Sequence, residues 1–248
     1  MNYPKKQIKI STKIIESVYN IFGEENIAVS ASGGKDSTLT LFLVREVVLK
    51  KGYKPPLVIV GDPFPIPKVR DFIVELVKEY GFPYVLWENY VTDECLNVRF
   101  EKTGNIRQCC LKCKVEVLKR ILREHNIKVL IVGIRWDEHP ARARDSYFEK
   151  HKNPDHIRVK PILHWSFIDV LEFYRIFPDF LNPAYLDGYT SLGCAPCTKP
   201  AVEKKFKTAE EFIDYVEKQF LEGKLRERQG RIIDKELIIS RLRKLGYF

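Results

Sequence analysis

Six consecutive residues near the N-terminus, Ser32 to Ser37, have the composition of a phosphate-binding turn. Two adjacent glycines allow the backbone to approach an anion and to adopt dihedral angles that are closed to other residues. Hydroxyl groups and the ammonium group of Lys35 add hydrogen-bond donors and positive charge. The spacing of the glycines and the lysine differs from that of the Walker phosphate loop, so we expect the turn to hold phosphates in a different way. The predicted nucleotide-binding residues are Ser30, which precedes the turn, and Ser32, Gly33, Gly34, Lys35, Asp36 and Ser37 within it. Lys35 is also expected to act in catalysis.

The elements on either side of this turn would position it. Residues 26–31 form a short apolar run typical of a buried strand, and residues 36–51 have a helical periodicity that ends at Gly52. A helix that begins at the turn directs its free N–H groups and the positive end of its dipole at a bound anion. The turn would also lie at the carboxyl edge of a parallel sheet, where such sheets bind ligands.

Up to about residue 132 the chain alternates between predicted helices and strands. Helical periodicity covers 7–22, 69–80 and 113–125, and buried strands are predicted at 57–60, 84–87 and 128–132. This alternation predicts an α/β fold in which a parallel twisted sheet has helices on both faces.

The pattern changes beyond residue 132. Residues 134–165, rich in Arg, Asp, Glu and Pro, are expected to form loops. A helix over 165–177, an irregular segment over 181–200 and amphipathic helices over about 208–222 and 233–245 would complete the chain. We therefore predict a nucleotide-binding α/β domain over 1–160 and a small helical, cysteine-bearing C-terminal portion over 161–248.

Composition limits the partners and the location of the protein. The 248 residues include 42 basic and 33 acidic side chains, and the net charge of +9 suits polyanionic partners from nucleotides to nucleic acids. No apolar run is long enough to span a membrane, and the N-terminus does not resemble a signal peptide. We therefore expect a cytoplasmic protein without a membrane partner, and we also expect it to form a homo-oligomer.

Six cysteines are grouped in a way that indicates metal or redox chemistry rather than disulfides. The vicinal pair Cys109 and Cys110 is followed much later by the CxxC pair Cys194 and Cys197. Four thiolates suit a 4Fe–4S cluster or tetrahedral zinc, and the spacing alone does not separate these two.

The other two cysteines are expected to differ from each other. Cys113 lies between Lys112 and Lys114 near the predicted start of a helix, which should lower the pKa of its thiol. It could be a nucleophile, a sulfur carrier, a cluster ligand or a small buried residue. Cys95 is expected to be structural. The five histidines show no ligand spacing and are also expected to be structural.

The segment Ser-Gly-Gly-Lys-Asp-Ser resembles the signature of the PP-loop superfamily, the adenine-nucleotide alpha hydrolases. Three further segments, in the same order along the chain, resemble assimilatory adenylyl-sulfate reductases. They are residues 109–120 (CCLKCKVEVLKR), 133–142 (GIRWDEHPAR) and 189–200 (YTSLGCAPCTKP). The similarity runs over roughly residues 25–202 and points to the phosphoadenosine phosphosulfate (PAPS)/adenylyl-sulfate (APS) reductase family.

The resemblance implies roles for the matching residues. The implied ligands of a 4Fe–4S cluster are Cys109, Cys110, Cys194 and Cys197. The implied anion-binding arginines are Arg135, Arg142 and Arg144, a task that suits the guanidinium fork. Lys114 would place positive charge between cluster and substrate. Gly133 and Asp62 would line the nucleotide site, although Asp62 could equally be a turn residue before Pro63. Arg135 and Cys113 join Lys35 as predicted catalytic residues.

Two departures from the reductases bear on the mechanism. No cysteine follows Cys197 in this sequence, whereas those enzymes carry a catalytic cysteine in a C-terminal tail. The phosphate loop is complete, as it is in ATP-cleaving members of the superfamily.

Three hypotheses for the function follow. The first is a PAPS/APS reductase-like iron–sulfur enzyme that binds an adenine sulfonucleotide and releases sulfite with the help of a redox or sulfur donor protein. The alternative is an ATP pyrophosphatase that adenylates a nucleic acid or small molecule for sulfur insertion. The third is a non-catalytic nucleotide- and cluster-binding sensor. The implied cofactors are a 4Fe–4S cluster and an adenine nucleotide: APS, PAPS, or ATP with Mg²⁺.

Overall fold

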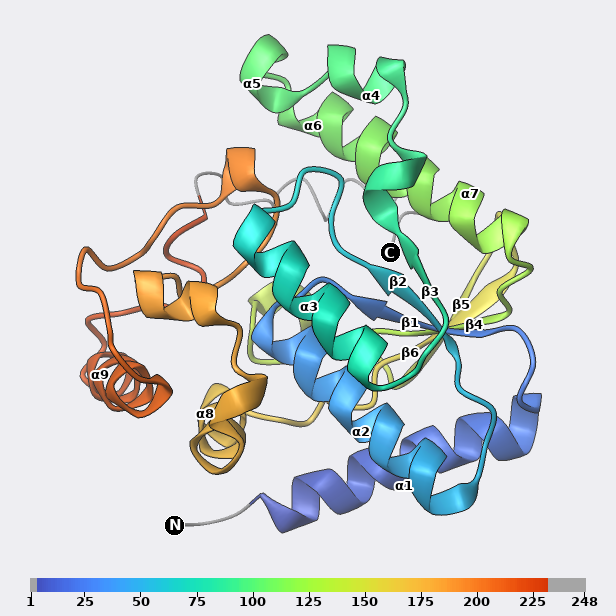
Figure 1. The fold of residues 1–248 in the computed structure, drawn as a ribbon, viewed down its shortest axis with the longest axis horizontal. Coiled ribbons are helices and arrows are strands. Elements are labelled where there is room, and N and C mark those ends of the chain that lie inside the picture. The colour runs from blue at the N-terminus through green and yellow to red at the C-terminus, as the bar shows by residue number, and fades with distance from the viewer. Residues whose placement is uncertain (1–3, 232–248) are drawn as a thin grey trace.

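The computed structural model describes residues 4–231 of the chain and contains a six-stranded sheet (Figure 1). The strands are β1 (Ile27–Ala31), β2 (Leu57–Val60), β3 (Tyr84–Leu86), β4 (Val129–Ile131), β5 (Phe148–His151) and β6 (His156–Val159). Their order is β3–β2–β1–β4–β6–β5. All neighbouring pairs are parallel except β5 and β6. The predicted α/β fold is therefore confirmed, with one antiparallel strand at its edge.

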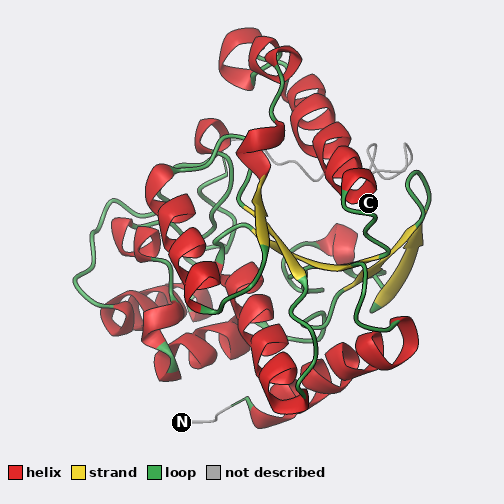
Figure 2. Ribbon diagram, turned by 45° about the vertical axis from the view of Figure 1, so that its right-hand side comes forward, coloured by secondary structure: helices red, strands yellow, loops and turns green. Residues whose placement is uncertain are grey.

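Helices cover both faces of this sheet (Figure 2). The α-helices of the described residues are α1 (Lys5–Phe22), α2 (Lys35–Lys51), α3 (Pro67–Glu79), α4 (Asp93–Asn97), α5 (Phe100–Thr103), α6 (Ile106–Cys110), α7 (Val117–Glu124), α8 (Phe167–Ile176) and α9 (Ala209–Leu221), of which α4, α5 and α9 lie away from the sheet (Figure 1). Alternate residues of β1 face the two layers, as the period of a strand requires. Val29 packs in the large cluster that includes α1, α2, α3 and α8, whereas Ala28 packs with α7.

Residues 134–165 do not form loops throughout, and this expectation was wrong. Strands β5 and β6 pair as a hairpin, and β6 continues the parallel sheet beside β4. Glu149, His151, His156 and Arg158 share one face of the hairpin, and Lys150 stands among the apolar residues of the other face, so no apolar run marks the strands in the sequence. Polar residues of the hairpin, among them His151, His156 and Arg158, line a cavity beside the sheet.

The helix expected from Cys113 begins earlier than the sequence predicted. Helix α6 starts at Ile106 and passes through a π-helical turn, Leu111–Glu116, directly into α7. Cys113 therefore lies in the middle of a continuous helical stretch and not at its N-terminus. The π-helical turn shifts the register of side chains by one residue at this point.

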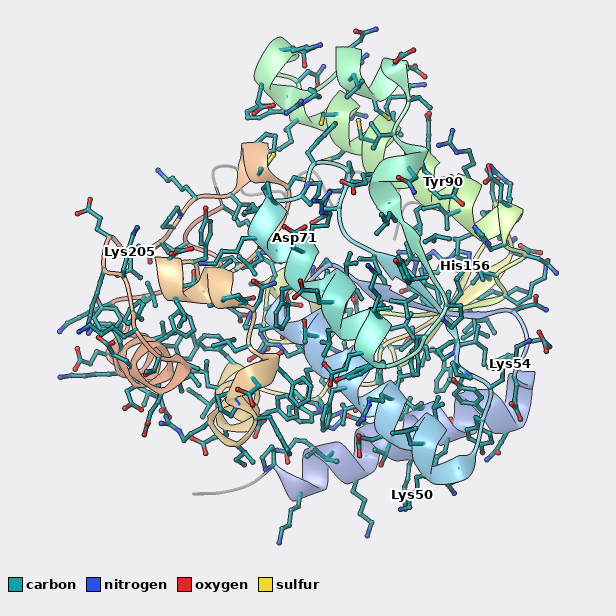
Figure 3. The ribbon with its side chains drawn as sticks, viewed as in Figure 1. Lys50, Lys54, Asp71, Tyr90, His156 and Lys205 are labelled. Carbon is teal, nitrogen blue, oxygen red and sulfur yellow. The ribbon has the colours of Figure 1, made fainter. Side chains whose placement is uncertain are left out.

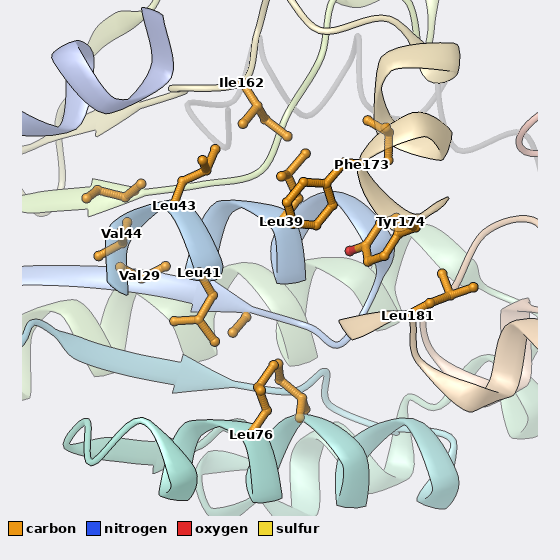
Figure 4. Close-up of a cluster of buried hydrophobic side chains, with 14 of the residues drawn as sticks. Val29, Leu39, Leu41, Leu43, Val44, Leu76, Ile162, Phe173, Tyr174 and Leu181 are labelled. Atoms are coloured by element: carbon orange, nitrogen blue, oxygen red, sulfur yellow. The ribbon is translucent and has the colours of Figure 1, made fainter. Parts of the chain in front are cut away.

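The C-terminal part packs closely on the sheet layer. Figure 4 shows Phe173 and Tyr174 of α8 beside Leu39 of α2, and all three belong to one buried cluster. The predicted division near residue 160 stays a prediction. The helix predicted over 233–245 lies outside the described residues. Within residues 4–231, helices long and apolar enough to cross a membrane are absent.

Candidate functional site

The phosphate loop connects β1 to α2, as the sequence predicts. Gly33 has a φ of +81°, and a Cβ atom at this position would lie 2.8 Å from Cγ1 of Val69. A left-handed backbone and the close approach of α3 therefore both require glycine at position 33. Gly34 is extended, and α2 begins directly after it. Ser37 donates its hydroxyl to the carbonyl oxygen of Gly34 at 2.9 Å, which fixes the turn.

A second glycine, Gly133, brings the end of β4 against this turn. A Cβ atom on Gly133 would lie 2.5 Å from the carbonyl oxygen of Asp36 and 2.8 Å from the amide nitrogen of Ser37. Backbone therefore touches backbone here, and a side chain would push the loop after β4 away from the start of α2. This contact explains the glycine at the head of the segment 133–142.

Lys35 and Arg135 form a buried ionic network with two carboxylates. Lys35 Nζ lies 3.0 Å from Oδ2 of Asp36 and pairs closely with Oε1 of Glu227. Arg135 places Nε 2.7 Å from Oδ1 of Asp36 and Nη2 2.5 Å from the same Oε1 of Glu227. The network thus joins the phosphate loop, the loop after β4 and the segment after α9.

Electrostatics keep this network charged. Burial by itself would raise the pKa of Asp36, but Arg135 and then Lys35 outweigh burial and lower it to about 2. Burial likewise opposes the charged form of Lys35, yet Asp36 and Glu227 raise the pKa of Lys35 above its ordinary value. Lys35 and Asp36 are therefore both ionised at neutral pH.

Arg135 is buried beside the phosphate loop. Its side chain is 0% exposed, and it contacts a third carboxylate, Asp137, at 2.8 Å. A guanidinium group held by three carboxylates is a positioning group that ties the loop after β4 to the phosphate loop. Arg135 is not among the residues that line the cavity beside the phosphate loop, and its predicted catalytic role stays a prediction.

Two tyrosines from the C-terminal portion hold the backbone of Lys35. The N–H of Lys35 donates to the hydroxyl of Tyr185 at 2.8 Å, and the hydroxyl of Tyr174 donates to the carbonyl oxygen of Lys35 at 2.5 Å. Burial raises the pKa of Tyr185 to about 12, so its hydroxyl keeps its proton at neutral pH. That proton is available to a ligand, because the hydroxyl oxygen acts as the acceptor toward Lys35.

A cavity of about 270 Å³ opens beside the phosphate loop. Cationic side chains that line it are Lys35, Lys114, Arg142, Arg228 and Arg231. Lys114 Nζ lies 2.5 Å from Oδ1 of Asp62, at the end of β2. Burial opposes the charge on Lys114, but Asp62 raises the pKa of Lys114 above the ordinary value. The arrangement can bind a polyanion next to the loop.

A second cavity of about 260 Å³ continues from the first. The two share lining residues, among them Ser32, Ser37, Asp62 and Lys114. The apolar walls of the second cavity include Trp87, Leu118 and Leu130, and Ser30 and Arg158 also line it. Its size and its apolar walls suit a nucleobase.

The β5–β6 hairpin gives this second cavity two histidines. His151 and His156 pair across the hairpin with ring centroids 5.1 Å apart, and Figure 3 labels His156 near the edge of the sheet. Both are buried and both line the cavity. That the five histidines are structural stays a prediction, and these two also contribute to the cavity wall.

Five cysteines meet in one small cavity: Cys109, Cys110, Cys113, Cys194 and Cys197. All five are buried and free of disulfides. The N–H of Ala195 donates to the carbonyl oxygen of Phe64 at 2.8 Å, which ties the CxxC turn to the loop after β2, and Phe64 lines the same cavity. Convergence of four or five buried thiols from separate segments suits a thiolate-bound metal centre. The two halves of the predicted ligand set are therefore brought together.

Cys113 does not have the lowered pKa expected from its basic neighbours. A hydrogen bond with Cys109 and burial together raise the pKa of the Cys113 thiol. Its Sγ also lies 3.4 Å from the carbonyl oxygen of Cys95. The lysine side chains on either side point elsewhere: Lys112 pairs with Glu94 and Lys114 with Asp62. Cys113 therefore has the surroundings of a buried thiol and not those of a reactive thiolate.

Several site residues were missed in the sequence. Tyr185, Glu227, Arg228 and Arg231 reach the site from residues that precede and follow α9. The sequence held one signal for three of them: the run RERQGR at residues 226–231, after an amphipathic helix, places charged residues on both sides of a glycine. Of the predicted arginines, Arg142 lines the phosphate cavity and pairs with Glu138, whereas Arg144 is exposed.

Comparison with known sequences identifies relatives of two kinds. The adenosine 5′-phosphosulfate reductase of Staphylococcus haemolyticus is 25% identical over 201 residues, which cover 78% of each chain. The adenosine 5′-phosphosulfate reductase 1 of Bacillus subtilis is 35% identical over 94 residues, and the chain spans only 40% of that relative. A probable FAD synthase of Schizosaccharomyces pombe is 28% identical over 79% of this chain and 69% of the relative.

Solved structures share the fold. The Candida glabrata FMN adenylyltransferase in complex with FAD and pyrophosphate superposes with a TM-score of 0.62 at 20% identity, covering 93% of this chain and 88% of that one. The U34-tRNA thiolase of Methanococcus maripaludis with its 4Fe–4S cluster has a TM-score of 0.53 at 18% identity, covering 95% and 80%. At these identities the likeness establishes the architecture and nothing finer.

The family model of the phosphoadenosine phosphosulfate reductase domain matches residues 26–200. That range contains the phosphate loop, Gly133 and all six cysteines. The chain therefore belongs to the phosphoadenosine phosphosulfate reductase family.

Proposed function

We propose that the protein is a PAPS/APS reductase-like enzyme that cleaves an adenine sulfonucleotide beside an iron–sulfur centre. One observation carries this proposal: Cys110 and Lys114 line both the phosphate cavity and the cysteine cavity. A nucleotide whose α-phosphate occupies the loop would therefore place the next acidic group along its chain close to the cysteines.

Substrate recognition follows from the two connected cavities. The adenine base would occupy the second cavity between Trp87 and Leu118, and the ribose would pass the Asp62–Lys114 pair. The phosphate would then meet the N-terminus of α2. Arg142, Arg228 and Arg231 would bind the oxygens of the terminal sulfate, because forked guanidinium groups match tetrahedral oxyanions.

Cys109, Cys110, Cys194 and Cys197 would hold the 4Fe–4S cluster, which when bound would supply a polarisable, redox-active centre next to the sulfate. Lys114 would place positive charge between the cluster and the sulfate, and its pairing with Asp62 fixes the direction of its ammonium group. Burial of these cysteines excludes bulk water from the metal centre.

The reaction breaks the bond between the sulfate sulfur and the bridging oxygen of the α-phosphate. Two electrons reduce the sulfur to sulfite, and the nucleoside phosphate leaves with the bridging oxygen. An external dithiol supplies the two electrons, releases two protons to solvent and is oxidised to a disulfide. Lys35, Ser37 and the Tyr185 hydroxyl stabilise the charge that develops on the leaving phosphate.

A second candidate is an ATP-dependent adenylyl transferase, and the complete, fully assembled phosphate loop favours it. An acceptor oxygen would attack the α-phosphate of ATP, and pyrophosphate would leave onto the loop. The similarity to a probable FAD synthase over 79% of the chain also supports this chemistry. The adenylated acceptor would then be open to displacement by a sulfur nucleophile.

One assay separates the candidates. Anaerobically purified protein is given APS, PAPS or ATP, with a dithiol donor, and both sulfite and pyrophosphate are measured. Sulfite released from a sulfonucleotide supports the reductase, whereas pyrophosphate released from ATP without sulfite supports the transferase. If neither product forms although the nucleotides bind, the chain is a sensor and both enzyme proposals fail.

A further inference from the structure

We propose that Glu227 is an internal counter-anion of the phosphate loop, which a nucleotide's phosphate must displace from Lys35. This inference rests on the proposed nucleotide site and identifies a residue that sets the affinity of that site for phosphate. It holds equally for a sulfonucleotide and for ATP, because both place a phosphate on the same loop.

The position of Glu227 is that of a bound anion. Its carboxylate is 7% exposed, and a single oxygen, Oε1, is shared by Lys35 Nζ and by Arg135 Nη2. Lys35 belongs to the phosphate loop and lines the phosphate cavity. One anionic oxygen held between an ammonium and a guanidinium group is the arrangement expected for a phosphoryl oxygen at such a loop.

The segment that carries Glu227, residues 225–231, is anchored on both sides of it. Leu225 is 6% exposed and packs in the main hydrophobic cluster. At the other end, the carbonyl oxygen of Gly230 accepts a hydrogen bond from the N–H of Lys199 at 3.0 Å, and the guanidinium of Arg231 donates to Thr198 at 2.9 Å. These anchors on either side of Glu227 place its carboxylate on the loop.

The same segment also faces the ligand with positive charge. Arg228 and Arg231 line the phosphate cavity on either side of Gly230. When a phosphate replaces the Glu227 carboxylate, the segment therefore still contributes two cations to the site. The charge of Glu227 therefore lowers the affinity of the site for an anionic ligand, whereas the charges of Arg228 and Arg231 raise that affinity.

Burial explains why the loop holds a counter-anion. Lys35 is 4% exposed, and a buried ammonium group without an anionic partner is strongly unfavourable. Asp36 is already shared with Arg135, so Lys35 depends on Glu227 when no phosphate is bound. An incoming phosphate takes over the role of anionic partner to Lys35. Because the phosphate must first displace the Glu227 carboxylate, the net affinity of the site for phosphate is lower than it would be without that carboxylate.

The test measures binding of inorganic pyrophosphate by isothermal titration calorimetry. Glu227→Gln keeps the size of the side chain and an oxygen for Arg135 but removes the charge. We expect it to bind pyrophosphate at least about tenfold more tightly than the unmodified protein, since one neighbouring charge ordinarily changes an equilibrium by that factor or more. Glu222→Gln, which breaks an exposed pair with Lys224, is the matched control and should bind as the unmodified protein does.

Unchanged or weaker binding by Glu227→Gln overturns the inference. If that variant fails to fold, Glu227→Asp keeps the charge but withdraws it from Lys35 by one methylene group, and it should bind pyrophosphate more tightly. Amide hydrogen exchange adds an independent readout: pyrophosphate should accelerate exchange around residue 227 in the unmodified protein, and unaltered exchange contradicts displacement. If neither pyrophosphate nor adenosine monophosphate binds to any of the proteins, the nucleotide site itself is refuted. Equal binding to all of them refutes only the role of Glu227.

Discussion

The hydroxyl oxygen of Tyr185 accepts a hydrogen bond from the backbone N–H of Lys35 at 2.8 Å. The two residues are 150 positions apart, so a residue of the C-terminal portion completes the phosphate loop formed by the N-terminal strand and helix. Tyr174 makes the matching contact with the carbonyl oxygen of Lys35. The phosphate site is therefore a product of both parts of the chain.

Tyr185→Phe should weaken nucleotide binding and lower the free energy of unfolding. The substitution leaves the buried N–H of Lys35 without its acceptor and removes the donor directed at the phosphate cavity. Loss of such a buried partner costs about 1–3 kcal/mol. Urea unfolding and calorimetric titration with adenosine monophosphate measure the two effects. Tyr215→Phe, on the partly exposed side of α9, serves as the control, and equal losses in the two variants would refute the role of Tyr185.

Gly133→Ala should disrupt the phosphate loop through a steric clash alone. The new Cβ would lie 2.5 Å from the carbonyl oxygen of Asp36, and neither backbone can move without opening the contact between β4 and α2. We expect a loss of about 3 kcal/mol in the free energy of unfolding, together with weaker nucleotide binding.

Gly81→Ala provides the comparison for Gly133. Gly81 has a φ of +68°, and a Cβ atom added there would have no neighbour within 4 Å, so alanine should cost only about 1 kcal/mol of backbone strain. Chemical denaturation distinguishes the two. A Gly133→Ala protein as stable as Gly81→Ala would contradict the close contact.

Local features of the sequence were sufficient to predict the phosphate loop and the order of strands β1 to β4 along the chain. The apolar runs are short and continuous, and Gly33 and Gly34 follow the first of them closely. The β5–β6 hairpin was missed because its cavity face carries His151, His156 and Arg158, which interrupt the apolar pattern. An alternating pattern of apolar and charged residues can equally be a loop when considered without its partner strands.

The contacts that complete the site could not be predicted from local pattern. Glu227 and Lys35 are 192 residues apart, and only tertiary packing brings the carboxylate to the loop. Arg135 shows the same limit from the other side, because it was predicted to contact the substrate. In the structure its side chain is fully buried and forms ion pairs with three carboxylates. Sequence spacing identifies which residues carry charge, whereas the fold decides which of those charges face a ligand.

Cys194→Ser and Cys110→Ser should each abolish or strongly reduce iron binding. Both residues line the shared cysteine cavity, and a hydroxyl group is a poor substitute for a thiolate ligand. Iron and sulfide content and visible absorbance, measured on anaerobically purified protein, report the cluster. Cys95→Ser is the control, because Cys95 contacts Lys112 and Thr92 instead of lining that cavity. A colourless, zinc-loaded protein would refute the iron–sulfur proposal while leaving the thiolate site intact.

His156 should make the stability of the protein depend on pH. Burial, with a smaller contribution from Arg158 and His151, lowers the pKa of His156 to about 4, from an ordinary value of 6.5. Between these two values the unfolded chain binds a proton that the folded chain does not, so the free energy of unfolding falls as the pH falls from about 6.5 to about 4. The full effect of this one group would be about 3 kcal/mol. Thermal unfolding at several pH values measures it.

His156→Gln removes the titrating group and should flatten this part of the stability curve. The amide side chain can still donate to the carbonyl oxygen of Pro154, which Nδ1 of His156 approaches at 2.8 Å. Lys152→Gln changes the charge of the same exposed turn without removing a histidine, so it should keep the original pH dependence. Identical curves for the two variants would show that the buried imidazole of His156 is not the source of the acid sensitivity.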